Sequence, residues 1–339
     1  MKVIVAGFFV SILTACGGGS TPSELSTPRV VVVTREPQKS LFYRDARLNL
    51  VKHIITIQGD RVLILGNQVA CITERSGRAE GCIDLPVDLW DLDVLIDASG
   101  NPTTIVGKGG WGKPSVAVMD LKGTLKWRFD GGFDVMDIPV VAETRDGAVV
   151  VVGNRTFDLR TGAAVDAHLC DCGAVGSADF DRDGRRDIVQ ARQGYLRVIN
   201  GSGEELVGAQ IGTGYWEKPM VAHSPEPFVV LSTNGEIAIY DRELKEKRRF
   251  KTPGAQLPLH AAAAAFLDAR LDGPFAVLIK GRGGWHRTIL YVYGAEGDLI
   301  YKEILDDDYE SISPYKTADG ALAFFIGGRG EVWSYQFAG

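Results

Sequence analysis

The sequence predicts an all-β protein, a seven-bladed β-propeller of four-stranded blades. A unit made of a small turn, an apolar strand, a Gly-rich turn and a second strand recurs about every 43 residues, which is the length of one blade. The composition agrees, because 45% of the residues are hydrophobic, 41 of 339 are glycine, and no stretch shows a sustained helical period. Such a chain favours many short strands joined by turns.

The repeats fill the chain from residue 29 to residue 339 as one domain. The second strand of each repeat follows a turn, and these turns are anchored at Gly59, Gly100, Gly147, Gly184, Glu226, Gly273 and Gly320. The last repeat ends after residues 332–337 and lacks a fourth strand. We expect residues 29–34, which include four consecutive valines, to pair beside residues 332–337. The N- and C-terminal strands would then close the ring and remove open sheet edges.

Residues 1–15 have the features of a secretory signal peptide. Lys2 precedes an apolar stretch over residues 3–13, which is too short to span a membrane. Residues 16–28 are rich in Gly, Ser, Thr and Pro and are expected to form a flexible tether.

The end of this signal resembles the lipobox of bacterial lipoproteins. The matching residues are Leu13, Thr14, Ala15 and Cys16. The resemblance implies cleavage before Cys16 and lipidation of its thiol and new amino group, and several acyl chains give stable anchoring. Gly17 after the cysteine implies transport to the outer membrane, with the periplasmic or cell-surface side left open. The alternative is a plain cleavable signal with a fortuitous cysteine.

The formal net charge of −6 argues against nucleic acid as a partner. It fits Ca²⁺ and basic protein surfaces better than an acidic membrane surface. We therefore expect membrane contact through the lipid anchor only.

Residues 179–187 form an acidic loop with the spacing of a Ca²⁺ site. The candidate ligands are Asp179, Asp181, Asp183 and Asp187 at positions one, three, five and nine, and the backbone carbonyl of Arg185 at position seven. Gly184 stands at position six. Position twelve is Gln190 in place of the Glu that closes a helical EF-hand, and an apolar strand follows, so we expect one Ca²⁺ between strands. The alternative is a solvated acidic turn, in which four carboxylates would repel one another.

Four cysteines remain after Cys16. Cys71 and Cys82 flank a turn at equal distances and should face each other across a hairpin, where a disulfide would brace an early blade. Cys170 and Cys172 could form a strained disulfide, remain thiols or bind a soft metal. A disulfide is favoured over metal, because His168 is the only further ligand nearby.

Aromatic and acidic residues gather in the links between blades and in the links between second and third strands. In a propeller both kinds of link lie on one face, and the acidic loop lies on the other. The predicted partner-binding residues are Trp90, Asp91, Trp111, Phe133, Asp134, Tyr215, Trp216, Glu217, Trp285 and Tyr309. Aromatic rings with polar neighbours on a rigid ring suit a binding surface. The alternative is that these rings fill gaps between blades.

The acidic loop and the recurrent Asp-Gly, strand, Gly, strand pattern resemble FG-GAP/VCBS propeller repeats. That resemblance implies Ca²⁺ in loops between strands, here in one of seven copies. Residues 123–129 also show a weaker overlap with PQQ-like repeats, which occur in a lipoprotein of the outer-membrane barrel-assembly machinery.

The sequence predicts a non-catalytic protein. It contains no Gly-x-Ser-x-Gly motif, and its five histidines have no catalytic spacing. Three hypotheses follow, in order: a scaffold or assembly factor for envelope proteins, a glycan-binding lectin, and an enzyme acting on polysaccharide or with a quinone.

Overall fold

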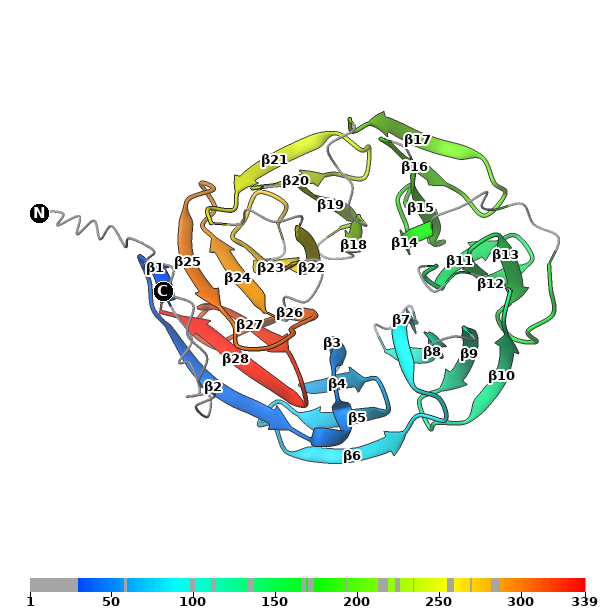
Figure 1. Cartoon of the computed structure of the whole chain (residues 1–339), viewed down its shortest axis with the longest axis horizontal. Helices are drawn as coiled ribbons and strands as arrows, with labels where there is room; N and C mark the ends of the chain where they lie inside the picture. Colours follow the sequence, from blue (N-terminus) through cyan, green and yellow to red (C-terminus); the bar gives the residue numbers. More distant parts are fainter. Residues whose placement is uncertain are drawn as a thin grey trace, which may run out of the picture.

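Seven antiparallel sheets stand around a common axis (Figure 1). The computed structural model describes residues 30–57, 60–97, 101–110, 114–132, 134, 137–165, 169, 174–192, 194–212, 219–222, 226–233, 235–254, 259–268, 270–281 and 287–338. The arrangement confirms the predicted all-β, seven-bladed propeller. Among these residues, no helix has the length and apolar character needed to cross a membrane.

The sheets are numbered here in chain order, and each runs from an inner strand at the axis to an outer strand at the rim. Sheet 1 contains β3 (Val51–Ile57), β4 (Arg61–Gly66), β5 (Val69–Glu74) and β6 (Ala79–Asp84). Sheet 2 contains β7 (Leu89–Ile96), β8 (Pro102–Gly109), β9 (Ser115–Asp120) and β10 (Leu125–Asp130). Sheet 3 has three strands in the described part of the chain, β11 (Val140–Thr144), β12 (Gly147–Val152) and β13 (Arg155–Asp158).

The remaining sheets complete the ring. Sheet 4 contains β14 (Ala174–Ala178), β15 (Asp187–Arg192), β16 (Tyr195–Ile199) and β17 (Glu205–Gln210). Sheet 5 contains β18 (Met220–Ala222), β19 (Phe228–Thr233), β20 (Glu236–Tyr240) and β21 (Glu246–Lys251). Sheet 6 contains β22 (Leu259–Phe266), β23 (Phe275–Gly281), β24 (Thr288–Tyr293), β25 (Leu299–Ile304) and β1 (Val30–Val33). Sheet 7 contains β26 (Ser311–Lys316), β27 (Leu322–Gly327), β28 (Glu331–Phe337) and β2 (Pro37–Arg44).

The second strand of each sheet is the apolar run that marks the repeat. In β4 and β27 five successive residues are buried, because neighbouring sheets cover both faces of these strands. Outer strands such as β10 and β17 alternate between exposed and half-buried residues, because only one of their faces meets another sheet. Apolar clusters fill the spaces between adjacent sheets, and the cluster between sheets 5 and 6 includes the stacked rings of Phe250 and Phe275.

The N-terminal segment closes the ring, but with a different strand from the one predicted. β2 pairs with β28 from Pro37↔Phe337 to Arg44↔Glu331. The valine run of residues 29–34, expected in that position, instead supplies β1, which pairs with β25 and adds a fifth strand to sheet 6. Residues 30–33 and 37–44 both form β-strands, and a strand-forming sequence does not specify which strand it pairs with. The closing strand is therefore one strand later in the chain than predicted.

The short helix η1 (Ala46–Leu48) joins the closing strand to sheet 1. Its N-cap Asp45 accepts a hydrogen bond from the Arg47 backbone N–H. Leu48, the last residue of this helix, is fully buried.

Candidate functional site: an axial cavity and an acidic loop

A cavity of about 330 Å³ lies on the axis of the ring. All seven inner strands or the residues just before them contribute to its lining, through Lys52, Trp90, Val140, Ser177, Met220, His260 and Glu310 among others. Most of these residues lie near the beginning of their strands. The cavity therefore lies toward the end of the ring where the links between sheets enter the inner strands, which is the face predicted to bind a partner. We call this end the cavity face.

One side of the cavity holds a cluster of ion pairs between sheets 1, 6 and 7. Lys52 Nζ lies 2.5 Å from Glu310 Oε2, and Lys280 pairs with both Glu310 and Asp308. Burial by itself would raise the pKa of Glu310, but the two lysines outweigh it and lower that pKa from 4.5 to about 2. Glu310 is therefore a fixed negative charge near neutral pH.

Arg186 reaches across the ring to Asp93. Its Nη2 donates to both carboxylate oxygens, at 2.9 and 3.1 Å, and to the Ser177 carbonyl at 3.3 Å. The Val141 backbone N–H also donates to Asp93, at 2.9 Å from Oδ2. Three inner strands, β7, β11 and β14, are thereby joined at the axis. Asp93 and Ser177 are the lining residues farthest along β7 and β14 from the cavity face. Arg186, which contacts both, therefore forms the floor of the cavity.

Lys108, Asp91 and His53 add to the polar lining and its support. Lys108 pairs with Asp91 at 3.2 Å and donates to the Asp137 carbonyl. His53 Nε2 lies 3.1 Å from the Leu92 carbonyl and must donate there, because a carbonyl oxygen only accepts. Burial lowers the pKa of His53, so its ring is neutral at pH 7.

Trp90 supplies the aromatic surface of this lining. It is the second residue of β7 and is 36% exposed. A tryptophan that is partly open to solvent and lines a cavity offers a flat apolar surface to a bound group.

The acidic loop lies at the opposite end of the ring, between β14 and β15. One carboxylate oxygen from each of Asp179, Asp181 and Asp187 lies within 4.8 Å of the others. The loop folds on itself through hydrogen bonds from the Gly184 N–H to Asp179 and from the Asp183 N–H to Asp181. Gly184 has a φ of +85°, a conformation that favours glycine.

Two features of this loop fit a hard cation. Asp179 Oδ1 is buried and has no hydrogen-bond partner. Asp187 is also buried, which raises the pKa of its carboxyl to about 7, and a bound cation would offset that cost of burying the charge. Asp183 lies outside the three-carboxylate group, and its side chain accepts from the Arg185 N–H at 2.7 Å.

The loop is connected to the axial cavity by its eighth residue, Arg186. The Arg186 N–H donates to the Glu143 carboxylate of β11, and the Arg186 carbonyl accepts from the Glu143 N–H. The segment that carries the acidic loop at one end of the ring thus provides the cavity floor.

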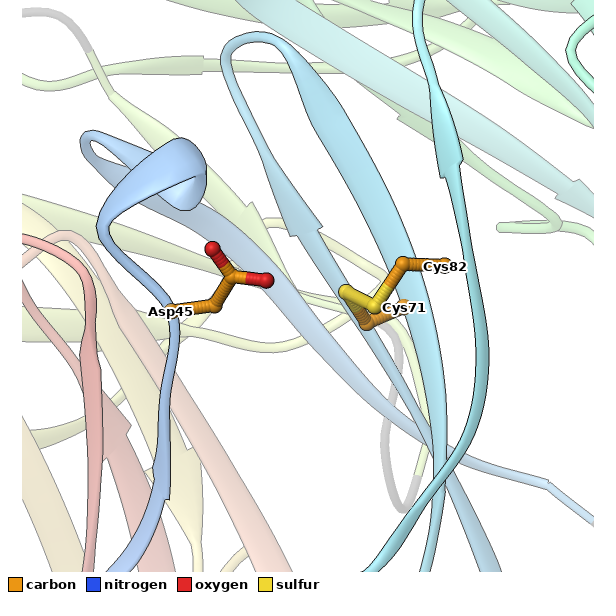
Figure 2. Close-up of side chains that lie close together, drawn as sticks. All are labelled: Asp45, Cys71 and Cys82. Carbon is orange, nitrogen blue, oxygen red and sulfur yellow. A yellow bond between two sulfur atoms is a disulfide. The ribbon is translucent and has the colours of Figure 1, made fainter.

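The predicted disulfide between Cys71 and Cys82 is confirmed. The two residues face each other across β5 and β6, with an S–S distance of 2.08 Å and a Cα–Cα distance of 4.1 Å (Figure 2). Asp45 lies beside the two sulfurs. Because the sulfurs are bonded to each other, this group is a covalent brace and not a set of metal ligands.

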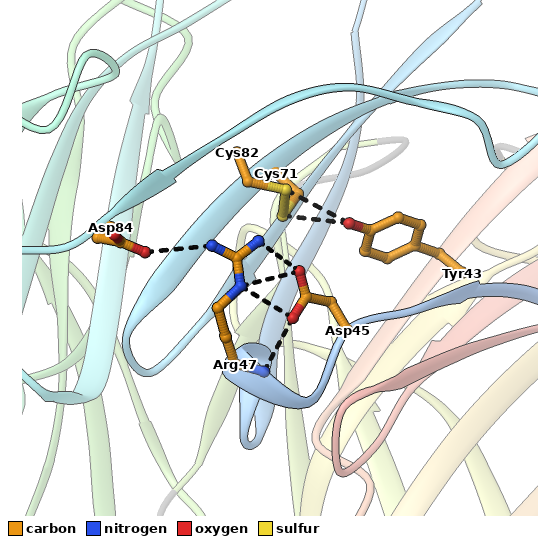
Figure 3. Close-up of polar contacts among 6 residues, drawn as sticks. All are labelled: Tyr43, Asp45, Arg47, Cys71, Cys82 and Asp84. Atoms are coloured by element: carbon orange, nitrogen blue, oxygen red, sulfur yellow. Dashed lines mark hydrogen bonds and ion pairs between the residues drawn. A yellow bond between two sulfur atoms is a disulfide. The ribbon is translucent and has the colours of Figure 1, made fainter.

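Residues of the closing segment contact this brace. The Tyr43 hydroxyl lies 3.5 and 3.3 Å from the sulfurs of Cys71 and Cys82 (Figure 3). Arg47 pairs with Asp45 at 2.6 Å and with Asp84 of β6 at 3.4 Å, and its hydrogen bond lowers the pKa of Asp45. The disulfide thus lies where the closing strand meets sheet 1.

The structure places the predicted partner-binding residues unequally. Trp90 and Asp91 line the cavity, and Asp134 is exposed, with its backbone N–H bonded to Asp137. Tyr309 is only 6% exposed and packs in the core between sheets 6 and 7, so it does not offer its ring to a partner. The predicted residues outside the described part of the chain are Cys16, Trp111, Phe133, Cys170, Cys172, Tyr215, Trp216, Glu217 and Trp285.

Lys52, Asp93, Arg186 and Glu310 are cavity residues that the sequence did not single out. Each carries a charge within or beside a largely apolar strand, and this pattern could have identified them. Such a charge is costly to bury unless it is paired, which suggests a polar axis.

No protein-family model matches the chain. No curated protein matches it either. Among solved structures, it is similar to virginiamycin B lyase from Staphylococcus aureus, with a TM-score of 0.55 and 11% identity over 89% of this chain and 99% of that one.

Two further propellers are similar. BBS1N, solved in complex with ARL6DN, has a TM-score of 0.54 and 14% identity over 91% of this chain and 98% of that one. BamB from Moraxella catarrhalis has a TM-score of 0.49 and 12% identity over 90% of this chain and 100% of that one. At identities this low, the likenesses to virginiamycin B lyase and BBS1N show a shared fold alone.

Proposed function

We propose that this protein is a non-catalytic, lipid-anchored scaffold that binds an envelope protein at its cavity face. The observation that carries the proposal is the convergence of all seven inner strands on one polar cavity with an exposed tryptophan in its lining. A surface assembled from seven sheets is rigid, and aromatic and charged groups on a rigid surface bind partners at low entropic cost.

The charged groups of the cavity favour binding over acid–base chemistry. Glu310 is held ionised by two lysines, and Asp93 is held by Arg186 and the Val141 N–H. A general acid or base works best with a pKa near the ambient pH, and the lowered pKa of Glu310 lies well below that range.

The structural likenesses bear on this proposal only through the fold. BBS1N is seen in complex with ARL6DN, whereas virginiamycin B lyase is an enzyme by name. The same architecture therefore accommodates both functions, and the site must decide between them.

Two observations support an exported, anchored protein. A disulfide such as Cys71–Cys82 persists in oxidising compartments. Val30 pairs with Glu303 near the end of β25, from which the chain continues to the cavity face, so Val30 lies toward that face. The 14 Cα–Cα steps from Cys16 to Val30 span at most about 50 Å when extended. A lipid on Cys16 would therefore keep the cavity face near the outer membrane, in reach of partners there.

One Ca²⁺ in the acidic loop is part of the proposal. Asp179, Asp181 and Asp187 would hold it, and Asp183 and the Arg185 carbonyl are the further ligands expected from the loop spacing. The ion would neutralise the clustered carboxylates and stabilise the folded state. The resemblance to FG-GAP/VCBS repeats supports the same assignment.

The test is affinity capture from detergent-solubilised envelopes with the tagged lipoprotein. Trp111→Ala and Trp285→Ala alter two links predicted to lie on the cavity face. Ile96→Ala is the matched control, because Ile96 is 48% exposed at the far end of β7, about 20 Å from Trp90. We expect stoichiometric capture of a protein by the parent and by Ile96→Ala, and weaker capture by the two tryptophan variants.

Equal capture by all four proteins would place the binding surface elsewhere. Recovery of glycan without any protein would favour the lectin hypothesis and refute the scaffold.

A further inference from the structure

The axial cavity has the size and shape of a small-molecule site. Its volume of about 330 Å³ is at the lower end of the range for ligand pockets. The ion pairs of Glu310 with Lys52 and Lys280 bound it on one side, and Arg186 forms its floor. The partly exposed Trp90 is also part of its lining. This cavity opens within the cavity face, and the links around it form the surface where a protein partner is proposed to bind.

The described charges in and around the cavity cancel. The four cations are Lys52, Lys108, Arg186 and Lys280, and the four carboxylates are Asp91, Asp93, Asp308 and Glu310. Each cation pairs with at least one of these carboxylates, at distances up to 3.4 Å. A strongly anionic or cationic ligand would meet as many like charges as opposite ones and would have to break these pairs.

Two of the paired groups keep unused hydrogen-bonding capacity. The Glu310 carboxylate accepts from Lys52 and Lys280, and the Arg186 guanidinium donates from Nη1 and Nη2. A carboxylate accepts up to about four hydrogen bonds and a guanidinium donates five, so the lining offers both acceptors and donors in fixed positions. A hydroxyl group both donates and accepts, so a neutral molecule with several hydroxyls matches this lining without disturbing the pairs.

Trp90 adds an apolar component to a polar site. A sugar ring has hydroxyls at its edges and C–H groups on its faces, so its face can lie on an indole while its hydroxyls reach the charged groups. An apolar ligand would leave these polar groups desolvated and unpaired.

We propose that the axial cavity binds a neutral sugar ring, with Trp90 as its platform and the paired charges of Lys52, Glu310 and Arg186 as its hydrogen-bonding partners. This site goes beyond the proposed scaffold function and does not depend on it. The sugar is a free saccharide or one unit of a glycan chain, and both sources share the same chemistry at the cavity.

The experiment is isothermal titration of the full-length protein, solubilised in a detergent whose headgroup is not a sugar. The neutral probes are glucose, galactose, N-acetylglucosamine and the oligomers of each. Glycylglycine, citrate and spermidine test zwitterionic, anionic and cationic ligands. We expect at least one neutral sugar to bind and the three charged probes to bind more weakly or not at all.

Variants of β7 locate the site. Trp90→Ala should lower sugar affinity by about tenfold, since an aromatic contact of this kind is lost, whereas Trp90→Phe should retain most of it. Ile96→Ala should bind like the parent. Circular dichroism and thermal melting of each variant establish that it is folded before titration.

The outcomes separate the two sources and the alternatives. Equal affinity for monomers and oligomers indicates a free saccharide, and tighter binding of oligomers indicates a glycan chain. No binding of any neutral sugar, tighter binding of a charged probe, or unchanged binding by folded Trp90→Ala would each overturn the proposal. Loss of protein capture with sugar binding intact would count only against the scaffold.

Discussion

Lys39 connects the ring-closing strand to sheet 6 through a buried carboxylate. Glu303 of β25 is only 3% exposed, and its Oε1 lies 2.5 Å from Lys39 Nζ. The hydroxyls of Tyr301 and Tyr335 donate to Oε2 at 2.7 and 2.9 Å, and the lysine also lies over both rings. The charges of Lys39 and Glu303 therefore balance each other within the protein. Lys39→Met would leave the buried Glu303 carboxylate without its cation.

The size of the effect follows from the burial of the two partners. Removing one partner of a fully buried ion pair costs about 3–5 kcal/mol, because the remaining charge is left without compensation. Lys39 is 30% exposed, so water can replace part of the lost interaction. We expect Lys39→Met to lower the free energy of unfolding by about 2–3 kcal/mol, measured by urea denaturation with an unchanged slope.

Two controls separate the pair from general effects on β2. Arg44 lies on β2 like Lys39 and forms an exposed ion pair with Glu331 of β28. Arg44→Met should lower the free energy of unfolding by less than about 1 kcal/mol. Lys39→Met combined with Glu303→Gln removes both charges while keeping an acceptor for the tyrosine hydroxyls, so it should recover most of the loss. If Lys39→Met costs no more than Arg44→Met, or if the two substitutions of the double variant are additive, the closure does not depend on this pair.

Four further predictions follow. Asp181→Ala should abolish the increase in melting temperature on adding Ca²⁺ to chelated protein, whereas Asp146→Ala, in an equivalent turn of sheet 3, should leave it intact; equal responses would refute the site. Cys16→Ser should move the folded protein from the membrane to the soluble envelope fraction, and retention after a high-salt wash would argue against the lipid anchor. The lowered pKa of Glu310 stabilises the fold above pH 4.5, and this contribution should be lost as the pH falls toward 2; in Glu310→Gln the urea midpoint should vary less over that window, and unchanged pH dependence would count against the assignment. Cys82→Ser should lower the unfolding free energy by about 3 kcal/mol, and a loss equal to that caused by reducing the parent would attribute the effect to the disulfide.

Much of the fold could be predicted because the relevant interactions are local in sequence. Each blade repeats its turns and strands about every 43 residues, so the period and the apolar runs specify the number of blades. The Cys71–Cys82 pair lies within one hairpin, where a turn and its two strands fix which residues face each other. The three-carboxylate group also lies within nine consecutive residues.

The candidate site could be predicted only in part. The sequence selected Trp90 and Asp91, which line the axial cavity, because links of one kind all lie at the same end of a propeller. It also placed Tyr309 on that face, although the ring packs between two sheets. A single aromatic residue in a link has no sequence feature that distinguishes packing from exposure.

The sequence by itself determined the class of fold, the number of blades, the hairpin disulfide and the position of the acidic loop, since each depends on residues that are close in the chain. Only the tertiary structure decided which N-terminal strand closes the ring, and which charges meet at the axis. Arg186 and Asp93 are 93 positions apart, and Lys52 and Glu310 are 258 apart. Their pairing depends on the curvature of the whole ring, which brings seven inner strands together at one point and which no local pattern encodes.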